Sequence, residues 1–161
     1  MKRNSPGRIA PMLLLLFLLS ASAQAADEAV ISSGQTVYVP AYSHVYFGDR
    51  EGNFLLTVTL SVRNTDCNSP ITLSSVDYYD TDGKMVRAFL ERPLSIAPMA
   101  SKSFTIAESD KAGGLGANFL VRWNAAKTVN APIIESVMIG TRSQQGISFT
   151  SRGREVLEKA R

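Results

Sequence analysis

The chain has 161 residues, with 17 basic and 14 acidic side chains, one histidine and one cysteine. A single cysteine excludes an internal disulfide, so the hydrophobic core alone has to stabilise the fold. Three basic residues lie in the first eight positions, and without them the counts are 17 − 3 = 14 basic and 14 acidic; this balance argues against nucleic-acid binding, which needs clustered positive charge.

The first 25 residues have the three parts of a secretory signal peptide. Lys2, Arg3 and Arg8 precede the apolar run MLLLLFLL, and the small-residue site Ala23-Gln24-Ala25 follows it. The apolar run is well short of the ~20 residues that a membrane span needs. We therefore expect residues 1–25 to be removed, no membrane span in what remains, and a periplasmic or secreted protein. The remaining 161 − 25 = 136 residues suit one domain.

After a polar lead-in at residues 26–34, which we expect to be flexible, residues 35–47 alternate between apolar and polar side chains. Pro40 lies within this stretch and has no N–H to donate, which predicts an edge strand or a strand that breaks there.

The most regular strand pattern lies at residues 54–64, FLLTVTLSVRN. Leu56, Leu60 and their neighbours at every second position form an apolar face, and Thr59 belongs to the opposite, polar face. A strand with one apolar face needs a second layer to cover it.

Further short strands are expected at 71–80, 84–90, 93–98, 101–106, 117–125, 133–140 and 147–150. The segment 108–116 has the most flexible-looking composition, and its glycines favour a plain connection over an anion-binding loop. Residues 152–161 are expected to form a charged tail outside the domain. About eight strands at roughly ten-residue spacing predict an all-β protein. We expect a single antiparallel β-sandwich of immunoglobulin-like architecture over residues 35–151, with a small β-barrel as the alternative.

Four stretches resemble a family of small secreted bacterial proteins known as a domain of unknown function, number 3124. They are VYVPAYSHVYFGD, VDYYDTDGK, GANFLVRW and VMIGTRSQQGISFTSRG. The resemblance covers nearly all of the chain after residue 25. It implies an exported bacterial protein, and it supplies no activity, cofactor or catalytic residue.

The candidate binding residues are Tyr38, Tyr42, His44 and Tyr46, which alternation places on one face of residues 35–47. The opposite face carries the apolar residues that we expect in the core, Val37, Val39, Ala41, Val45 and Phe47. Exposed aromatic rings with polar tips suit sugars, peptides and protein partners. The ordinary alternative is a set of strand tyrosines covered by loops.

Asp77, Asp80 and Asp82 are weak candidates for a calcium site, because carboxylates two residues apart before a glycine are typical of calcium loops. The glutamate that completes an EF-hand is missing. A hairpin turn at residues 80–83 explains the same pattern, so we expect no metal.

His44 and Cys67 are the remaining reactive side chains. Cys67 lies in the polar stretch 64–70, where we expect a half-buried, inert thiol, with intermolecular pairing as the alternative. No nucleophile-elbow motif accompanies His44, and one histidine cannot form a multi-histidine metal site.

These observations favour a non-catalytic binding module for an unknown envelope protein or polymer, with no cofactor and no catalytic residues. The alternatives are a periplasmic hydrolase that uses His44 with a carboxylate, and a small-ligand or metal carrier. The sequence leaves the oligomeric state open.

Overall fold

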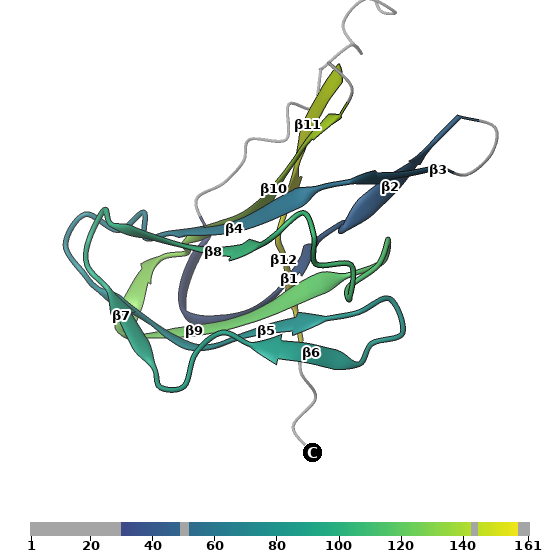
Figure 1. Ribbon diagram of the computed structural model, residues 1–161. Coiled ribbons are helices and arrows are strands. Elements are labelled where there is room, and N and C mark those ends of the chain that lie inside the picture. Colours follow the sequence, from purple (N-terminus) through teal and green to yellow (C-terminus); the bar gives the residue numbers. More distant parts are fainter. Residues whose placement is uncertain (1–29, 49–51, 143–144, 158–161) are drawn as a thin grey trace, which may run out of the picture.

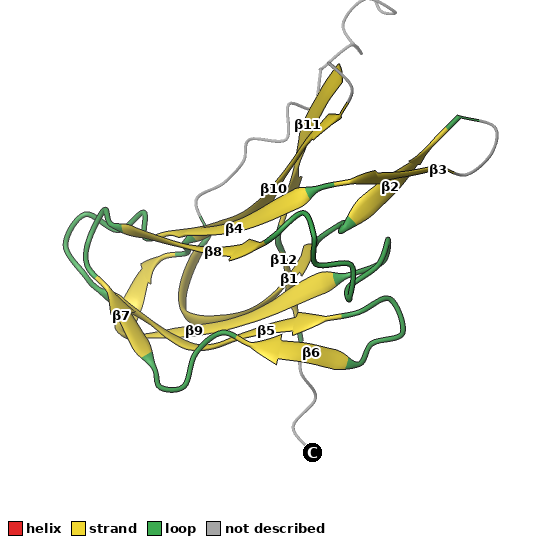
Figure 2. Cartoon of the chain, viewed as in Figure 1, coloured by secondary structure: helices red, strands yellow, loops and turns green. Residues whose placement is uncertain are grey.

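The structure is a computed structural model that describes residues 30–48, 52–142 and 145–157. The expected signal peptide at residues 1–25 lies outside these ranges. All regular structure in the described ranges is β-strand, as Figure 2 shows. No helix in this part of the chain is long and apolar enough to cross a membrane. The all-β prediction is therefore confirmed.

The described residues form three antiparallel sheets, seen in Figure 1. The strands are β1 (Ile31–Pro40), β2 (His44–Phe47), β3 (Gly52–Leu55), β4 (Thr57–Arg63), β5 (Ile71–Tyr79), β6 (Met85–Ala88), β7 (Leu94–Ile96), β8 (Ser101–Ile106), β9 (Asn118–Asn130), β10 (Ile133–Arg142), β11 (Gln145–Arg152) and β12 (Arg154–Val156). A six-stranded sheet has the order β12-β1-β9-β5-β6, with β7 also paired to β5, and a four-stranded sheet has the order β11-β10-β4-β8. Strands β2 and β3 form a separate two-stranded sheet.

One hydrophobic core joins the two larger sheets. Val58, Leu60 and Val62 of β4 are fully buried, which confirms the facing predicted for residues 54–64. From the other sheet, Phe119 and Trp123 of β9 enter the same core. Neither sheet closes on itself among the described strands, so the β-barrel alternative is not supported.

The domain extends beyond the expected limits of 35–151 at both ends. Residues 31–34, expected to belong to a flexible lead-in, form the start of β1. Part of the expected tail at residues 152–161 forms β12, which pairs antiparallel with β1. Both segments are polar, so their composition does not indicate a strand. Hydrogen bonds between backbone groups nevertheless hold them in the sheet.

Residues 35–47 do not form one strand. Strand β1 ends at Pro40, and residues 41–43 bend away before β2 begins at His44. The bend bonds to the segment before β9: Ala41 N–H donates to Ala117 O at 2.9 Å, and Ser43 N–H donates to Gly114 O at 3.0 Å. The bond of Ala41 continues the register of Pro40 with Asn118 by one pair, so the nitrogen of Pro40, which has no proton to donate, is directed away from β9.

The chain crosses from the four-stranded to the six-stranded sheet at Gly153, between β11 and β12. Its N–H donates to Ile134 O at 2.8 Å. A Cβ at this position would lie 2.6 Å from Val37 Cγ1 and 2.8 Å from Ile134 O. The close approach of the two layers therefore requires a glycine here.

Candidate functional site

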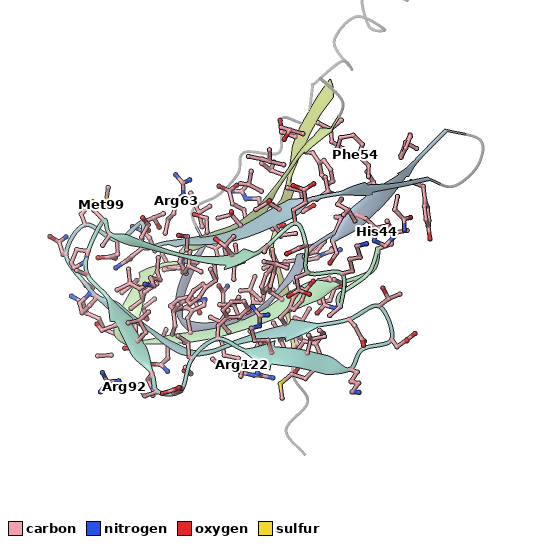
Figure 3. The ribbon with its side chains drawn as sticks, in the orientation of Figure 1. His44, Phe54, Arg63, Arg92, Met99 and Arg122 are labelled. Carbon is pink, nitrogen blue, oxygen red and sulfur yellow. The ribbon has the colours of Figure 1, made fainter. Side chains whose placement is uncertain are left out.

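Strands β2 and β3 form a hairpin that projects away from the two main sheets (Figure 1), and we call it the aromatic hairpin. Val45 lies opposite Phe54, Tyr46 opposite Asn53 and Phe47 opposite Gly52. Directly opposed residues of an antiparallel pair point to the same face. One face therefore carries Val45, Phe47 and Phe54, and the other carries His44 and Tyr46. Figure 3 shows His44 and Phe54 in this part of the molecule.

Two rings of the aromatic hairpin are more than half exposed. Tyr46 is 54% and Phe47 52% exposed. Each ring has an edge-to-face neighbour: Tyr46 lies 5.5 Å from His44 between centroids, and Phe47 lies 6.1 Å from Phe54. The Phe47 ring also covers Gly52, where a Cβ would lie 2.9 Å from Phe47 Cε1. The exposed rings are therefore supported by neighbours within the hairpin.

Tyr42 lies at the base of the hairpin and is half-buried, so the expectation that it would be exposed is wrong. Its ring packs edge-on against Phe149 of β11, with centroids 5.7 Å apart. Next to it, the buried Ser43 Oγ lies 3.0 Å from the hydroxyl of Tyr78. Burial raises the pKa of Tyr78, and the hydrogen bond from Ser43 opposes that rise.

Tyr38 is separate from the other three candidates. It lies on β1 between Leu120 and Arg154, on the outer face of the six-stranded sheet, and is 37% exposed. Because the chain bends at residues 41–43, the four residues do not form one stripe. The expected core face also fails beyond the bend, since Val45 is half-buried and Phe47 is exposed.

Within the described residues, no hydrogen bond or ion pair joins His44 to a carboxylate, so nothing there favours the hydrolase alternative. The same ranges contain no group of three or more His, Cys, Asp and Glu that could hold a metal ion.

The three aspartates of the possible calcium site have separate roles. Asp77 Oδ2 accepts a bond of 2.9 Å from Arg122 Nη1. Asp80 Oδ1 accepts the backbone N–H groups of Asp82, at 3.0 Å, and Lys84, at 2.8 Å. Gly83 has a φ of +78°, and its N–H donates to Asp80 O. The turn expected at residues 80–83 is present, and Asp82 is exposed on it.

The glycine-rich segment before β9 is not the loose connection that its composition suggests. Thr81 N–H donates to Gly113 O at 2.9 Å, and Gly116 N–H donates to Thr81 Oγ1 at 3.0 Å. A Cβ at Gly113 would collide with the hydroxyl of Tyr78. The glycines allow this segment to pack closely on the residues around the base of the aromatic hairpin.

Cys67 is exposed, so the expectation of a half-buried thiol is wrong. Its Sγ lies 3.9 Å from Sδ of the exposed Met99. Asp66 accepts the backbone N–H groups of Asn68 and Ser69, and the Asn68 bond is the main cause that lowers the pKa of Asp66. In Figure 3, Met99 and His44 lie at opposite ends of the molecule, which separates the thiol from the aromatic hairpin.

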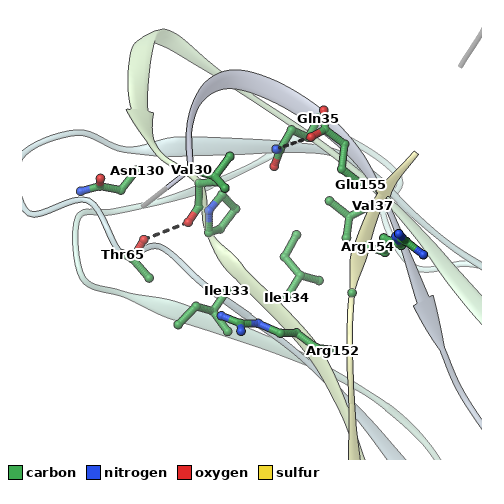
Figure 4. A pocket seen from close by; sticks show the side chains of 13 residues that line it. Val30, Gln35, Val37, Thr65, Asn130, Ile133, Ile134, Arg152, Arg154 and Glu155 are labelled. Carbon is green, nitrogen blue, oxygen red and sulfur yellow. Dashed lines mark hydrogen bonds between the residues drawn. The ribbon is translucent and has the colours of Figure 1, made fainter. Parts of the chain in front are cut away.

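A groove of about 610 Å³ lies where β1, β10 and the β11–β12 crossing meet, as Figure 4 shows. Its lining includes the apolar side chains of Val30, Val37, Ile133 and Ile134 together with Arg152, Arg154 and Glu155. Gln35 Nε2 donates to Glu155 Oε2 at 2.9 Å across one end. Sequence reasoning missed this groove because the lining residues from β1 lie more than 90 positions before those from β10 and the β11–β12 crossing.

The fold defines an all-β protein of two main antiparallel layers. The chain belongs to the family DUF3124, described as a protein of unknown function, whose family model matches residues 34–156. The resemblance seen in the sequence is therefore confirmed. No curated protein matches the chain. A solved structure, that of Thermotoga maritima 1070, is similar over 74% of this chain and 92% of its own, with 11% identity and a TM-score of 0.45.

Proposed function

We propose that the protein is an exported, non-catalytic binding module that recognises another envelope protein or polymer through the aromatic hairpin. The observation that carries this proposal is the exposure of Tyr46 and Phe47 on an element that projects from the core. The two rings lie on opposite faces of one narrow two-stranded element, and exposed large apolar side chains on such an element are characteristic of interaction sites.

Neighbouring rings hold the exposed aromatic side chains in place, and this favours binding. Tyr46 and Phe47 each contact a second ring, and Tyr42 packs against Phe149 at the base of the hairpin. Aromatic side chains that are already held in place lose little conformational entropy when a partner covers them. His44 and the tyrosine hydroxyl add polar groups that can orient the partner.

The proposal includes an immunoglobulin-like β-sandwich and a removed signal peptide. A core shared by the six-stranded and four-stranded sheets supports the sandwich, and the pattern of residues 1–25 supports export. Intact-mass measurement of protein from the periplasmic fraction is expected to give a chain that starts near Ala26. Full-length chain in the membrane fraction would contradict export with cleavage.

The binding surface is tested by a double variant, Tyr46→Ala with Phe47→Ala, used as bait in envelope extracts. Truncating aromatic anchors at an interface commonly costs 1 kcal/mol or more, so we expect capture to weaken by about fivefold or more. Met85→Ala is the matched control, since Met85 is 53% exposed but lies on β6 of the six-stranded sheet. Equal capture by the double variant and the control would refute the role of the hairpin.

A small-ligand carrier is the second candidate, because the groove beside Gly153 combines an apolar lining with arginines at its rim. These groups suit an amphipathic anion. Dodecanoate is expected to raise the melting temperature of the protein, and Ile133→Glu, which adds a negative charge at the groove, is expected to abolish that shift. An unchanged melting temperature in the wild-type protein would exclude this class of ligand.

A further inference from the structure

In the part of the chain that the structure describes, strand β11 pairs with another strand on one side only. It pairs with β10 through an unbroken register from Arg142↔Gln145 to Glu135↔Arg152. Among the described strands no other strand pairs with it, so it is the edge of the four-stranded sheet. Of the strands that end the two larger sheets, it is the longest, at 8 residues against 6 for β8, 4 for β6 and 3 for β12. Figure 1 shows β10 and β11 extending together from the sheet.

The bond pattern identifies which backbone groups of β11 face away from β10. Gly153 N–H donates to Ile134 O, which makes this pair a hydrogen-bonded one. Hydrogen-bonded and non-hydrogen-bonded pairs alternate along an antiparallel ladder. Counting back from Gly153, the N–H and C=O groups of Gly146, Ser148 and Thr150 are directed outward. These three residues therefore supply six outward backbone groups to the edge.

This edge lacks the devices that usually prevent strands from pairing. Proteins protect edge strands with proline, with lysine or with bulges. Strand β11 reads QGISFTSR, and its register has no bulge. Its one charged residue, Arg152, is at the end. The opposite edge, β8, carries Lys102 in its short sequence.

We propose that β11 pairs antiparallel with β11 of a second copy of the chain, about a two-fold axis that passes between the two facing Ser148 residues. This register places Ser148 opposite Ser148 and Gly146 opposite Thr150, which are the residues with outward backbone groups. The same register places Ile147 opposite Phe149 twice, and both side chains are half-buried on the inner face of the sheet. The strand is therefore complementary to a second copy of itself both in its outward backbone groups and in its inner side chains, as an isologous dimer requires.

The dimer joins two four-stranded sheets into one continuous eight-stranded sheet whose outer edges are the β8 strands. The two-fold axis is perpendicular to the sheet, so the inner faces of both copies remain on the same side. Arg152 of one copy lies at the opposite end of the paired strands from Arg152 of the other, which avoids like-charge repulsion. The strands of the aromatic hairpin do not pair in this dimer, although Phe149 contacts Tyr42 at the base of the hairpin. The Ser148 variants therefore test the dimer, and the Tyr46 and Phe47 variants test the proposed binding surface.

Sedimentation equilibrium of the purified protein tests the proposal. All measurements use a Cys67→Ser background, because the exposed thiol of Cys67 could itself join two chains. We expect a reversible dimer that Ser148→Pro, which removes an outward N–H, and Ser148→Lys, which sets two like charges opposite each other, weaken at least tenfold.

The matched controls lie on β8. Asn64 N–H donates to Ala100 O, so the same alternation directs the N–H of Ser103 outward on that edge. Ser103→Pro and Ser103→Lys are therefore expected to leave the dimer intact. The melting temperature of each variant shows that it has folded.

A cross-link locates the axis. Facing residues of a hydrogen-bonded pair have Cα atoms about 5.5 Å apart, which is within reach of a disulfide. Ser148→Cys in the Cys67→Ser background is expected to give a covalent dimer on mild oxidation, and Ser103→Cys is not. A monomer at about 100 μM, or a dimer that the folded Ser148 variants leave intact, would overturn the proposal.

Discussion

The hydroxyl of Tyr78 lies 3.0 Å from Oγ of Ser43, and both residues are buried. Tyr78 belongs to β5 of the six-stranded sheet, and Ser43 belongs to the bend that leads into the aromatic hairpin. Ser43 also bonds to Leu56, whose N–H donates to Ser43 O at 3.0 Å. One buried hydrogen bond therefore connects the base of the hairpin to the main body of the protein.

Replacing Tyr78 by phenylalanine removes this bond and leaves the buried Ser43 hydroxyl without it. We expect Tyr78→Phe to lower the free energy of unfolding by about 1–2 kcal/mol in urea titrations. Tyr79→Phe is the control, since Tyr79 points to the opposite face of the same strand and is expected to cost less than about 0.5 kcal/mol. Equal losses of unfolding free energy in the two variants would show that the hydrogen bond to Ser43 does not stabilise the fold.

The alkaline limb of the stability curve gives a second test of Tyr78. Burial raises its pKa above the usual value of 10.0, so the folded state holds the phenol proton more tightly than the unfolded chain does. This contribution is fully present below pH 10 and is lost as the pH rises above it. Urea titrations from pH 9 upward are expected to show a steeper loss of stability in the wild-type protein than in Tyr78→Phe. Parallel curves would contradict the shift.

Gly153→Ala tests the crossing between the two sheets. The new methyl group would meet Val37 Cγ1 at 2.6 Å and Val39 Cγ2 at 3.1 Å. Overpacking of this kind is expected to cost about 1–3 kcal/mol, measured by urea unfolding. Gly146→Ala serves as the control, because the nearest atom to its added carbon is 3.9 Å away. A Gly153→Ala protein of wild-type stability would show that the layers separate easily there.

Leu60→Ala and Thr59→Ala test the facing of β4. Leu60 is fully buried, whereas Thr59 lies on the outer face of the four-stranded sheet. Truncating the leucine is expected to lower the free energy of unfolding by about 2–5 kcal/mol, and truncating the threonine by much less. Similar losses for both substitutions would mean that β4 does not direct Leu60 into the core and Thr59 away from it.

The turn at residues 80–83 is expected to form without calcium. Asp80→Ala removes an acceptor of two backbone bonds and is expected to cost about 1 kcal/mol, while Asp82→Ala, at an exposed position, should cost less than about 0.5 kcal/mol. Calcium is expected to leave the melting temperature unchanged. A rise that a chelator reverses and that Asp82→Ala abolishes would identify a metal site.

Local patterns in the sequence predict the buried strands well. Residues 54–64 alternate so regularly that the inward position of Leu60 follows from sequence alone, and the turn before Gly83 has the residues that its backbone needs. The position of Tyr42 could not be predicted in the same way. Alternation continues through residues 41–43, but strand β1 ends at Pro40, and after the bond of Ala41 to Ala117 the backbone turns away and bonds through Ser43 to Gly114.

Long-range pairing accounts for the other differences. Arg154 and Glu155 read as part of a solvated tail, because the sequence does not show that β1 offers them a free edge. The groove is subject to the same limit, since Val37 and Ile133 belong to different sheets and meet only after both sheets have formed. In the sequence, Tyr46 and Phe47 are simply next to a turn. Only the structure shows that the hairpin projects from the main sheets and carries an exposed aromatic ring on each of its two faces.

The pairing of β1 with β12 has a consequence for synthesis. Gln35 and Glu155, which bond across this pair, are separated by 120 positions in the chain. The first strand of the domain cannot obtain this neighbour until the chain has been synthesised as far as residue 156. Pairings at such separation form late, because a long loop has to close first. The edge of β1 that β12 covers therefore stays open until late in folding.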